Sequence, residues 1–312
     1  MTTLSYKEIG GYFGLDLVLR YDNVKDSIAL NSARNCLRYV IKAFSISEIY
    51  IPFYTCPVVW QAIKKENCKI HFYHIDENFM PVSDFSENAY ILYNNYFGIC
   101  AGNVKSLASK YKNLIVDNAQ AFYMPQYGIA SFNSIRKFFG VPDGALLQSD
   151  KICDCEFKRD NSYQRFSHLL KRADVSAKFG YQDFLVNEDS LDDCEIKTMS
   201  NLTQKLFQTI DIEAAKEKRL ENFVYLNKYL SKSNELNICL DKDDVPMVYP
   251  YLTMRENLRA ELIKNKIFVA TYWNPQPENT QEGVFQKYLL PLPIDQRYDS
   301  KDLSRILEVI GA

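Results

Sequence analysis

The chain has 312 residues and a mass of 36.3 kDa, a size that suits one large α/β domain with a smaller appendage. Its 37 basic and 39 acidic residues give a net charge of −2, which provides no electrostatic basis for binding nucleic acid or a membrane surface. Only 11 residues are glycine, which disfavours a fold built on several glycine-rich phosphate loops. No signal peptide is visible and no apolar run approaches the ~18 residues of a membrane span, so we expect a cytoplasmic protein.

The cysteines and histidines do not form a recognisable metal site. The eight cysteines are scattered and, in a reducing compartment, are expected to act as small buried hydrophobic residues. Cys153 and Cys155 form a C-x-C pair, which differs from the C-x-x-C spacing of zinc and redox sites. His71 and His74 point to opposite faces of an apparent strand. We therefore expect no bound metal.

Between residues 25 and 150, short β-rich runs alternate with helical stretches. Apolar spacing predicts helices over 32–44, 57–67 and 104–112, with Ser32 as the N-cap of the first. Strands are predicted over 48–53, 69–76, 89–98, 113–119 and 144–150. Such alternation predicts a mostly parallel sheet with helices on both faces.

The second half of the chain is expected to contain a smaller α+β domain. Residues 201–233 have the spacing of one long helix, or of two helices with a break near Asp211. Strands over 245–254 and 266–273, and helices over 256–265 and 300–311, are predicted to follow. The predicted domains are therefore an N-terminal arm with a large domain over 1–204, and a linking helix with a small domain over 205–312.

Three segments follow predicted strands or begin helices, at the edge of the sheet where ligands bind in open α/β folds. The helix start at 30–35 favours an anion such as a phosphate, although most Ser-capped helices bind nothing. Asp117 closes an apolar strand, where it either pairs with a cation or caps the next turn. Lys137 lies between Ile135 and Phe138, and apolar surroundings favour a reactive amine, whereas a surface lysine is the commoner case.

The order of these three features matches the needs of pyridoxal phosphate. An amine can bind the aldehyde, a carboxylate can keep the pyridine nitrogen protonated, and a helix start can hold the phosphate. Lys137 follows Asp117 by twenty residues and precedes a turn at Gly144 and a strand. The combination is more informative than any one of its parts.

At these residues the sequence resembles a known family. VDNAQA (116–121) is similar to a strand end that reads E-D-A-A-Q-A, and SIRKFFGVPDGALLQSD (134–150) is similar to a Schiff-base lysine segment. Both belong to the DegT/DnrJ/StrS family of pyridoxal-phosphate-dependent sugar aminotransferases. NSARNCL (31–37) resembles that family's S-G-T-A-A-L. The resemblance covers roughly 25–150 and 245–312, and it implies fold type I, with a large, mostly parallel α/β domain and a smaller C-terminal α+β domain.

The resemblance implies a role for each matching residue. Lys137 would be catalytic and would bind pyridoxal 5′-phosphate as a Schiff base. Asp117 would contact the pyridine nitrogen, and Gln120 the phenolic oxygen. The phosphate would be bound by backbone groups of Ala33, Arg34 and Asn35.

The sequence departs from the family pattern at several positions. Cys56 stands where the family has an aromatic residue that stacks on the cofactor ring, so either Tyr54 or another aromatic residue is expected to stack, or the ring is held differently. Phe132 replaces a serine, and Ser134 is expected to take over its phosphate contact. The chain is short for the family, and the missing length is expected within 151–205, where the family places substrate contacts and contacts across the dimer.

The implied function is transfer of an amino group, from glutamate, to a keto sugar that is linked to a nucleotide, for surface polysaccharide or related biosynthesis. The implied assembly is a homodimer with active sites at the interface. Related sugar dehydratases carry histidine in place of the lysine, so Lys137 favours transamination. Two alternatives stay open: a non-catalytic or regulatory member of the same fold, and a dehydratase or lyase that uses the same cofactor.

Two further segments lie outside these motifs. GGYFG (10–14) is expected to belong to an arm that covers the domain or a dimer partner, because it does not follow a strand as a dinucleotide loop would. Tyr272, Trp273 and Asn274 follow a predicted strand and are expected either to line the mouth of the site or to pack the small domain.

Overall fold

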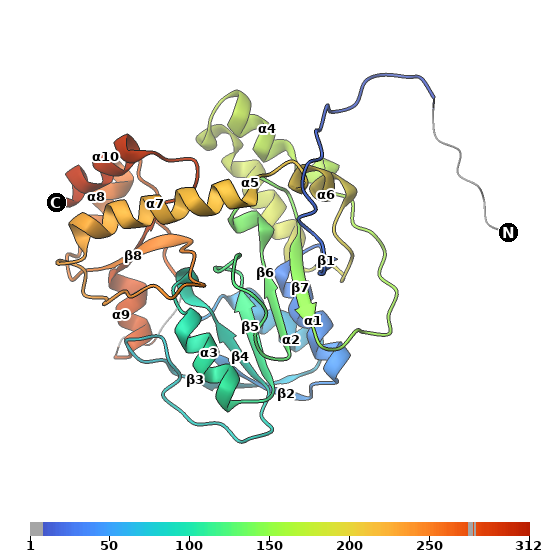
Figure 1. Cartoon of the computed structure of the whole chain (residues 1–312), viewed down its shortest axis with the longest axis horizontal. Coiled ribbons are helices and arrows are strands. Elements are labelled where there is room, and N and C mark those ends of the chain that lie inside the picture. The colour runs from blue at the N-terminus through green and yellow to red at the C-terminus, as the bar shows by residue number, and fades with distance from the viewer. Residues whose placement is uncertain (1–8, 274–276, 278) are drawn as a thin grey trace.

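A single seven-stranded sheet organises the first half of the chain (Figure 1). The structure is a computed structural model that describes residues 9–273, 277 and 279–312. The strand order is β1-β7-β6-β5-β4-β2-β3, with β7 antiparallel to both of its neighbours and the other pairs parallel. The strands are β1 (Ile28–Leu30), β2 (Glu48–Pro52), β3 (Lys69–Tyr73), β4 (Ile91–Asn94), β5 (Leu114–Asn118), β6 (Ala130–Asn133) and β7 (Ala145–Ser149). The predicted mostly parallel sheet is confirmed.

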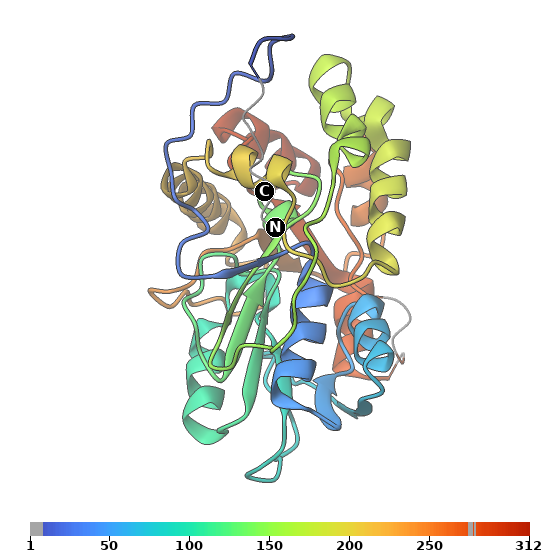
Figure 2. The same ribbon diagram turned by 90° about the vertical axis from the view of Figure 1, so that its right-hand side faces the viewer.

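Helices cover both faces of this sheet. In Figure 2, α1 (Ala33–Phe44) and α2 (Pro57–Lys65) lie on one side of the strands and α3 (Ala101–Lys110) lies on the other. Successive side chains of a strand point to opposite faces. Accordingly, Leu92 packs in the cluster with α1 and α2, whereas its neighbour Tyr93 packs in the cluster with α3.

Two predicted helix boundaries are confirmed by their capping bonds. The Ser32 hydroxyl accepts a hydrogen bond from the backbone N–H of Asn35 at the start of α1. The chain also breaks at Asp211, which separates α6 (Asn201–Phe207) from α7 (Ile212–Leu230). The Asp211 carboxylate accepts from Ala214 N at 2.9 Å, so the two-helix alternative is correct.

The charged segment after β7 forms helices that the sequence pattern did not predict. These are α4 (Ser167–Asp174) and α5 (Ala177–Asp192), which pack against each other as a hairpin. The strands β1 and β6 were also missed, because they are only three and four residues long. Within the described chain, no helix is both long and apolar enough to cross a membrane.

The C-terminal part is built on two antiparallel strands, β8 (Val248–Leu252) and β9 (Leu289–Pro293). They pack with part of α7, with α8 (Leu258–Lys264) and with α10 (Ser300–Ile310), while α9 (Gln281–Tyr288) leads into β9. The predicted strand over 266–273 is wrong, because these residues pair with no strand. Ile267 and Val269 are buried in the same cluster, so the apolar pattern there reflects burial without pairing.

Helix α7 contributes side chains to two hydrophobic clusters, one in the large domain and one in the C-terminal part. The predicted boundary after residue 204 falls inside α6, whose Phe207 packs with Ala215 of α7 against the large domain. Phe223, two turns further along α7, packs in the C-terminal cluster. The two-domain division remains a proposal, and this packing favours a boundary within α7.

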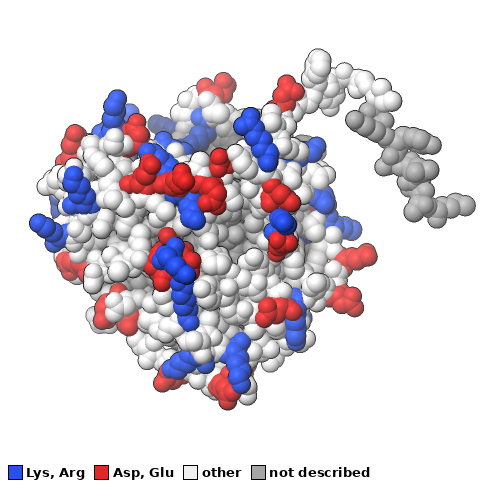
Figure 3. All heavy atoms as spheres, viewed as in Figure 1, with Lys and Arg blue, Asp and Glu red and all other residues white. Residues whose placement is uncertain are grey.

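The N-terminal arm hydrogen-bonds to residues 207–211 through residues 20–23, and its earlier described part extends away from the body of the protein (Figures 1 and 2). Ile9, Tyr12 and Phe13 are each at least 97% exposed. The expectation that this segment covers its own domain is therefore wrong, whereas contact with a partner stays a prediction. On the face drawn in Figure 3, basic and acidic side chains are interspersed.

Candidate active site

Asp117 and Lys137 line the same cavity at the carboxyl edge of the parallel strands. Asp117 is the fourth residue of β5, and Lys137 ends a short 3-10 helix, η2 (Ile135–Lys137), that directly follows β6. The two strands are neighbours in register, which brings their ends together. The other lining residues come from the ends of β2 and β4, from the turn after β5 and from the C-terminal part: Thr55, Cys56, Asn94, Asn95, Ala119, Gln120 and Trp273. The topology therefore gathers Asp117, Gln120 and Lys137 as the sequence predicted.

Of the two interpretations made for Asp117 from the sequence, the structure shows the cap, and pairing with a cation stays a prediction. Its Oδ1 atom accepts from the backbone N–H of Ala119 at 2.8 Å, so it caps the turn after β5. It also faces the cavity. Burial raises the pKa of Asp117 above its usual range, and the nearby ammonium of Lys137 opposes that shift. A cation placed in the cavity would further favour the carboxylate.

Lys137 is an exposed side chain in the single chain, which corrects the expectation of apolar surroundings. Ile135, Phe138 and Phe139 pack into a core cluster on the other side of the backbone, so they do not enclose the amine. Among the described residues, the ammonium has no hydrogen-bond partner. The amine is thus free to react with a group in the cavity.

Two buried polar atoms in the cavity lack partners within the described chain: Nε2 of Gln120 and Oδ1 of Asn94. The Gln120 Oε1 atom accepts from the backbone N–H of Phe97 at 2.9 Å, which leaves the amide nitrogen as the open donor. Asn94 donates to the hydroxyl of Thr55 at 2.8 Å, which leaves its oxygen as the open acceptor. Unpaired buried polar groups are rare, and a ligand is one way to satisfy them.

The sequence analysis missed Thr55, Asn94 and Asn95 as site residues. Asn95 is buried and donates to Asn118 at the end of β5, which ties the ends of β4 and β5 together. A signal for the asparagines was present, because two polar residues directly follow a buried apolar strand there. That pattern is typical of a strand end at a binding edge.

The start of α1 offers two free backbone donors. Within the described chain, the N–H groups of Ala33 and Arg34 have no hydrogen-bond partner. Asn35 differs, because its N–H already donates to both oxygens of Ser32. Two of the three predicted phosphate donors are therefore open, and the third is committed to the cap.

The first turn of α1 lies close to the strand-end carboxylate. Cys36 is fully buried, and its thiol pKa is raised well above the usual value by burial and, to a smaller extent, by the negative charge of Asp117. Ser134 lies between β6 and η2, is buried, and has no side-chain hydrogen bond among the described residues. Neither Cys36 nor Ser134 lines the cavity itself.

Acidic side chains of α5 lie beside the helix start and the lysine. Glu188 forms an ion pair with Arg136, whose Nη2 atom is 3.2 Å from Oε2, and Asp192 pairs with Arg34. Burial disfavours the charge on Glu188, but the cationic groups of Arg136, Arg34 and Lys137 hold its pKa below the usual value. These ion pairs place α5 beside the start of α1 and beside Arg136, and the substrate and dimer contacts expected within 151–205 stay a prediction.

Tyr54 does not reach the cavity, which corrects its predicted role. Its ring is fully buried among aromatic side chains, 4.9 Å from Trp273 and 5.7 Å from Tyr96 between ring centres. Trp273 is the single aromatic residue among the described residues that line the cavity. The expected placement of Trp273 at the site is therefore confirmed, and Asn274 lies outside the described residues.

The cavity is narrow, with a volume of about 20 Å³. That is room for about one water molecule. A planar cofactor ring can therefore enter only if side chains that line the cavity move.

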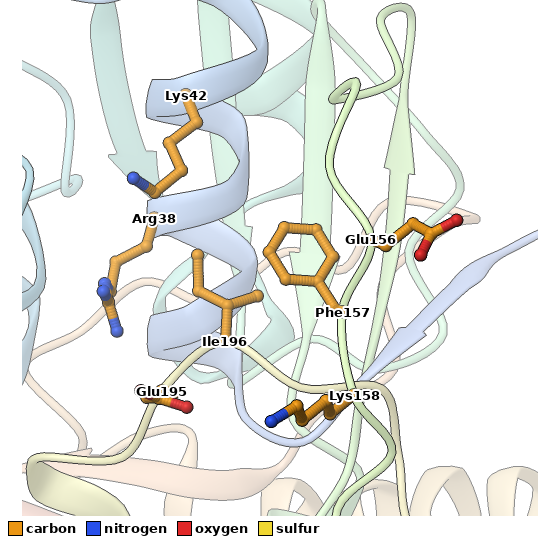
Figure 4. Close-up of a pocket in the computed structure, with 7 residues that line it drawn as sticks. All are labelled: Arg38, Lys42, Glu156, Phe157, Lys158, Glu195 and Ile196. Atoms are coloured by element: carbon orange, nitrogen blue, oxygen red, sulfur yellow. The ribbon is translucent and has the colours of Figure 1, made fainter.

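A second, larger hollow of about 290 Å³ lies between α1 and the segments 156–158 and 195–196 (Figure 4). Arg38 and Lys42 border it, but their charged ends point away from Phe157 at its centre. Both bind the buried Glu66, at 2.6 and 2.7 Å. This hollow does not gather a nucleophile with a base. No group of three metal-binding side chains occurs among the described residues.

The chain has the fold of the DegT/DnrJ/EryC1/StrS aminotransferases. A member from Brucella abortus aligns with a TM-score of 0.61 and 14% identity, over 92% of this chain and 86% of its own. Helicobacter pylori PseC, an aminotransferase of pseudoaminic acid biosynthesis, gives 0.61 and 15% over the same shares. The sugar aminotransferase CalS13 from Micromonospora echinospora gives 0.63 and 12%, over 91% and 86%. No family model and no curated protein sequence matches the chain.

At these identities the comparison establishes the fold. It confirms the fold type I architecture that the sequence resemblance implied.

Proposed function

We propose that this protein is a pyridoxal-phosphate-dependent aminotransferase that moves an amino group from glutamate to a keto sugar. The observation that carries the proposal is one cavity that holds the amine of Lys137, the carboxylate of Asp117 and the unpaired amide nitrogen of Gln120. Solved structures of the same fold support it. Spr1654 from Streptococcus pneumoniae was solved in a PLP form, and S. venezuelae DesV in complex with a ketimine intermediate.

The residues present fit the cofactor by their chemistry. Asp117 would bind the pyridine nitrogen, and the open Nε2 donor of Gln120 would bind the phenolic oxygen. The phosphate would be held by the free N–H groups of Ala33 and Arg34, with the unpaired hydroxyl of Ser134 as a third donor.

Lys137 and Asp117 would have different roles in the reaction. Pyridoxal phosphate, when bound, supplies an electron sink that stabilises negative charge at the substrate carbon. Lys137 would hold the aldehyde carbon at rest and, once displaced by the amino donor, would carry a proton between the two carbons that exchange it. Asp117 would keep the ring nitrogen protonated, and this cation would offset the burial that raises the pKa of Asp117.

The proposal includes a homodimer with the active sites at its interface. The exposure of Lys137 supports it, because a partner would cover the open side of the site. Exposed apolar side chains on the α4–α5 hairpin and on the arm also support it. They are Leu170, Val175, Phe179, Tyr181, Phe184 and Val186, and Ile9, Tyr12, Phe13, Leu15, Val18 and Leu19. We propose further that the acceptor sugar is linked to a nucleotide, that the product serves polysaccharide or related biosynthesis, and that the protein is cytoplasmic.

The test is spectroscopic. Purified protein mixed with pyridoxal phosphate should gain an absorbance band at about 420 nm, and glutamate should remove that band. Lys137→Ala should abolish it, while Lys112→Ala, at an exposed surface lysine, should not. A wild-type protein that shows no band, or a Lys137→Ala variant that keeps it, would refute the proposal. A panel of nucleotide-linked keto sugars would then identify the acceptor.

The same experiment separates the alternatives. A band that forms but persists in glutamate would favour the non-catalytic member of the fold, for which Cys56 and the narrow cavity are the supporting observations. Elimination of water from a sugar, without consumption of glutamate, would favour a dehydratase.

A further inference from the structure

The backbone just after Lys137 is held from the C-terminal part of the chain. The carbonyl oxygen of Phe138 accepts a hydrogen bond from Gln296 Nε2 at 2.7 Å and a second from Arg219 Nη2 at 3.5 Å. The Arg219 guanidinium carbon also lies 4.5 Å from the centre of the Phe138 ring. One residue next to the candidate catalytic lysine therefore has three contacts with two side chains more than 80 positions away.

Packing alone does not explain why a charged residue, Arg219, occupies this buried position. It lies on α7, is 1% exposed, and forms no ion pair within the described chain. Its hydrogen-bond acceptors are two backbone carbonyls, those of Met247 (at 3.0 Å) and Phe138, and its Nε atom has no partner. Burial lowers the pKa of Arg219 to about 10, which reflects the cost of keeping this charge out of water. An apolar side chain of similar volume would pack there at lower cost.

The backbone around Lys137 is held on both sides, because Arg136 pairs with Glu188 and because Phe138 and Phe139 pack in a core cluster and donate to the carbonyl of Ile135. The Lys137 side chain is exposed and has no hydrogen-bond partner among the described residues, and its N–H donates to Ser134 O at a long 3.3 Å. Position and direction of the amine therefore depend on how the turn after η2 is held. Arg219 and Gln296 supply that support on the C-terminal side.

We infer that Arg219 and Gln296 are positioning residues for Lys137. They clamp the Phe138 carbonyl and so fix the amine with respect to Asp117 and to the C-terminal part of the chain. This inference rests on the proposed function for its catalytic meaning, but the clamp itself can be measured without cofactor.

Three variants and one matched control test the clamp. Arg219→Met and Gln296→Met remove one donor each, and Arg219→Lys keeps the charge but can reach fewer acceptors. Asn234→Ala is the control, because Asn234 follows α7 and donates to the carbonyl of Pro250 at 2.9 Å, and it contacts neither the lysine segment nor the segment that carries Gln296. It should lower stability without loosening the clamp.

The first readout is hydrogen exchange of the cofactor-free proteins. The backbone amides of residues 138–141 should exchange about tenfold faster in Arg219→Met and Gln296→Met, as expected for the loss of one buried hydrogen bond. Arg219→Lys should fall between them and the wild type. Asn234→Ala should leave the exchange rates of these amides unchanged, even where it lowers the melting temperature by as much as the methionine variants do.

The second readout is the absorbance band of the bound cofactor at about 420 nm. In both methionine variants the band should form about tenfold more slowly, and the pH at its half-height should shift, whereas Asn234→Ala should match the wild type. Unchanged exchange in both variants, or an unchanged band in both, would overturn the inference. Should Arg219→Met fail to fold, the neutral and partly exposed Gln296 gives the same two readouts. A wild-type protein without the band refutes the proposed function, whereas a band insensitive to both variants refutes the clamp alone.

Discussion

The side-chain oxygen of Gln120 accepts a hydrogen bond from the backbone N–H of Phe97, and this bond leaves the amide nitrogen as the open donor of a residue that lines the cavity. The orientation of the open donor is thus set by the loop after β4. A donor held in this way suits an anionic oxygen, such as the phenolic oxygen of the proposed cofactor.

We predict that Gln120→Glu weakens cofactor binding by about tenfold or more, because a carboxylate replaces a donor with a negative charge. The dissociation constant is measured by titrating the absorbance band. Gln126→Glu serves as the control, since Gln126 is an exposed side chain. Equal affinity in Gln120→Glu and the wild type would exclude Gln120 from the cofactor site.

Replacing Asp117 with asparagine should stabilise the cofactor-free protein at neutral pH. Burial raises the pKa of Asp117 in the folded protein above its reference value of 3.8, so ionisation of this group costs folding free energy at any pH above that value. Below about pH 4 the carboxyl is protonated in both states, and the advantage of asparagine should vanish. Urea unfolding at pH 7 and pH 3.5 measures this difference.

The same Asp117→Asn variant should lose about 100-fold or more in kcat, because the ring nitrogen would lack its anionic partner. A gain in stability together with a loss of activity is typical of a group retained for function. A stability gain that persists unchanged at pH 3.5 would contradict the electrostatic explanation.

Gly98 should not tolerate a side chain. Its φ is +71°, and a Cβ atom there would lie 2.5 Å from the carbonyl oxygen of Val245. Gly98→Ala is expected to lower the free energy of unfolding by about 2 to 4 kcal/mol, from backbone strain and the clash together. Gly102→Ala is the matched control: it lies in α3 with nothing within 4 Å of its Cβ, and should stabilise by about 0.5 to 1 kcal/mol. Urea titration of both proteins gives the comparison.

The features that could be predicted from the sequence are those that depend on local pattern and strand order. The helices with regular apolar spacing were found, and the strand-end positions of Asp117 and Gln120 follow from the alternation of strands and helices. Lys137 joins them because β6 lies next to β5, although β6 itself is too short to show a pattern.

The features that could not be predicted depend on contacts between distant segments. The direction of Tyr54 is set by Tyr96 and Phe285, and Phe285 lies 231 positions further along the chain (285 − 54). The apolar run over 266–273 resembles a strand, but no neighbouring strand is placed to pair with it. Lys137 is exposed because its neighbours Phe138 and Phe139 pack into the core and do not surround the amine. The sequence alone cannot distinguish these two arrangements of apolar neighbours.

Trp273 is the residue that we expect to stack on the cofactor ring. It lines the cavity with Lys137 and Cys56, and its ring contacts those of Tyr54 and Tyr96, at 4.9 and 6.3 Å between ring centres. Trp273→Ala should weaken cofactor binding by about 2- to 10-fold, the usual contribution of an aromatic pair. Trp273→Phe should lose less, because it keeps an aromatic face.

A second substitution tests whether the effect arises from stacking or from packing. Cys56→Phe places an aromatic ring at the same cavity, and the space vacated in Trp273→Ala should accommodate it. The double variant should therefore regain most of the lost affinity, whereas Cys56→Ala combined with Trp273→Ala should regain none. In Trp60→Phe, which leaves Trp273 as the single tryptophan, cofactor should quench the emission strongly. Affinity that is unaffected in Trp273→Ala would show that the ring is held without this residue.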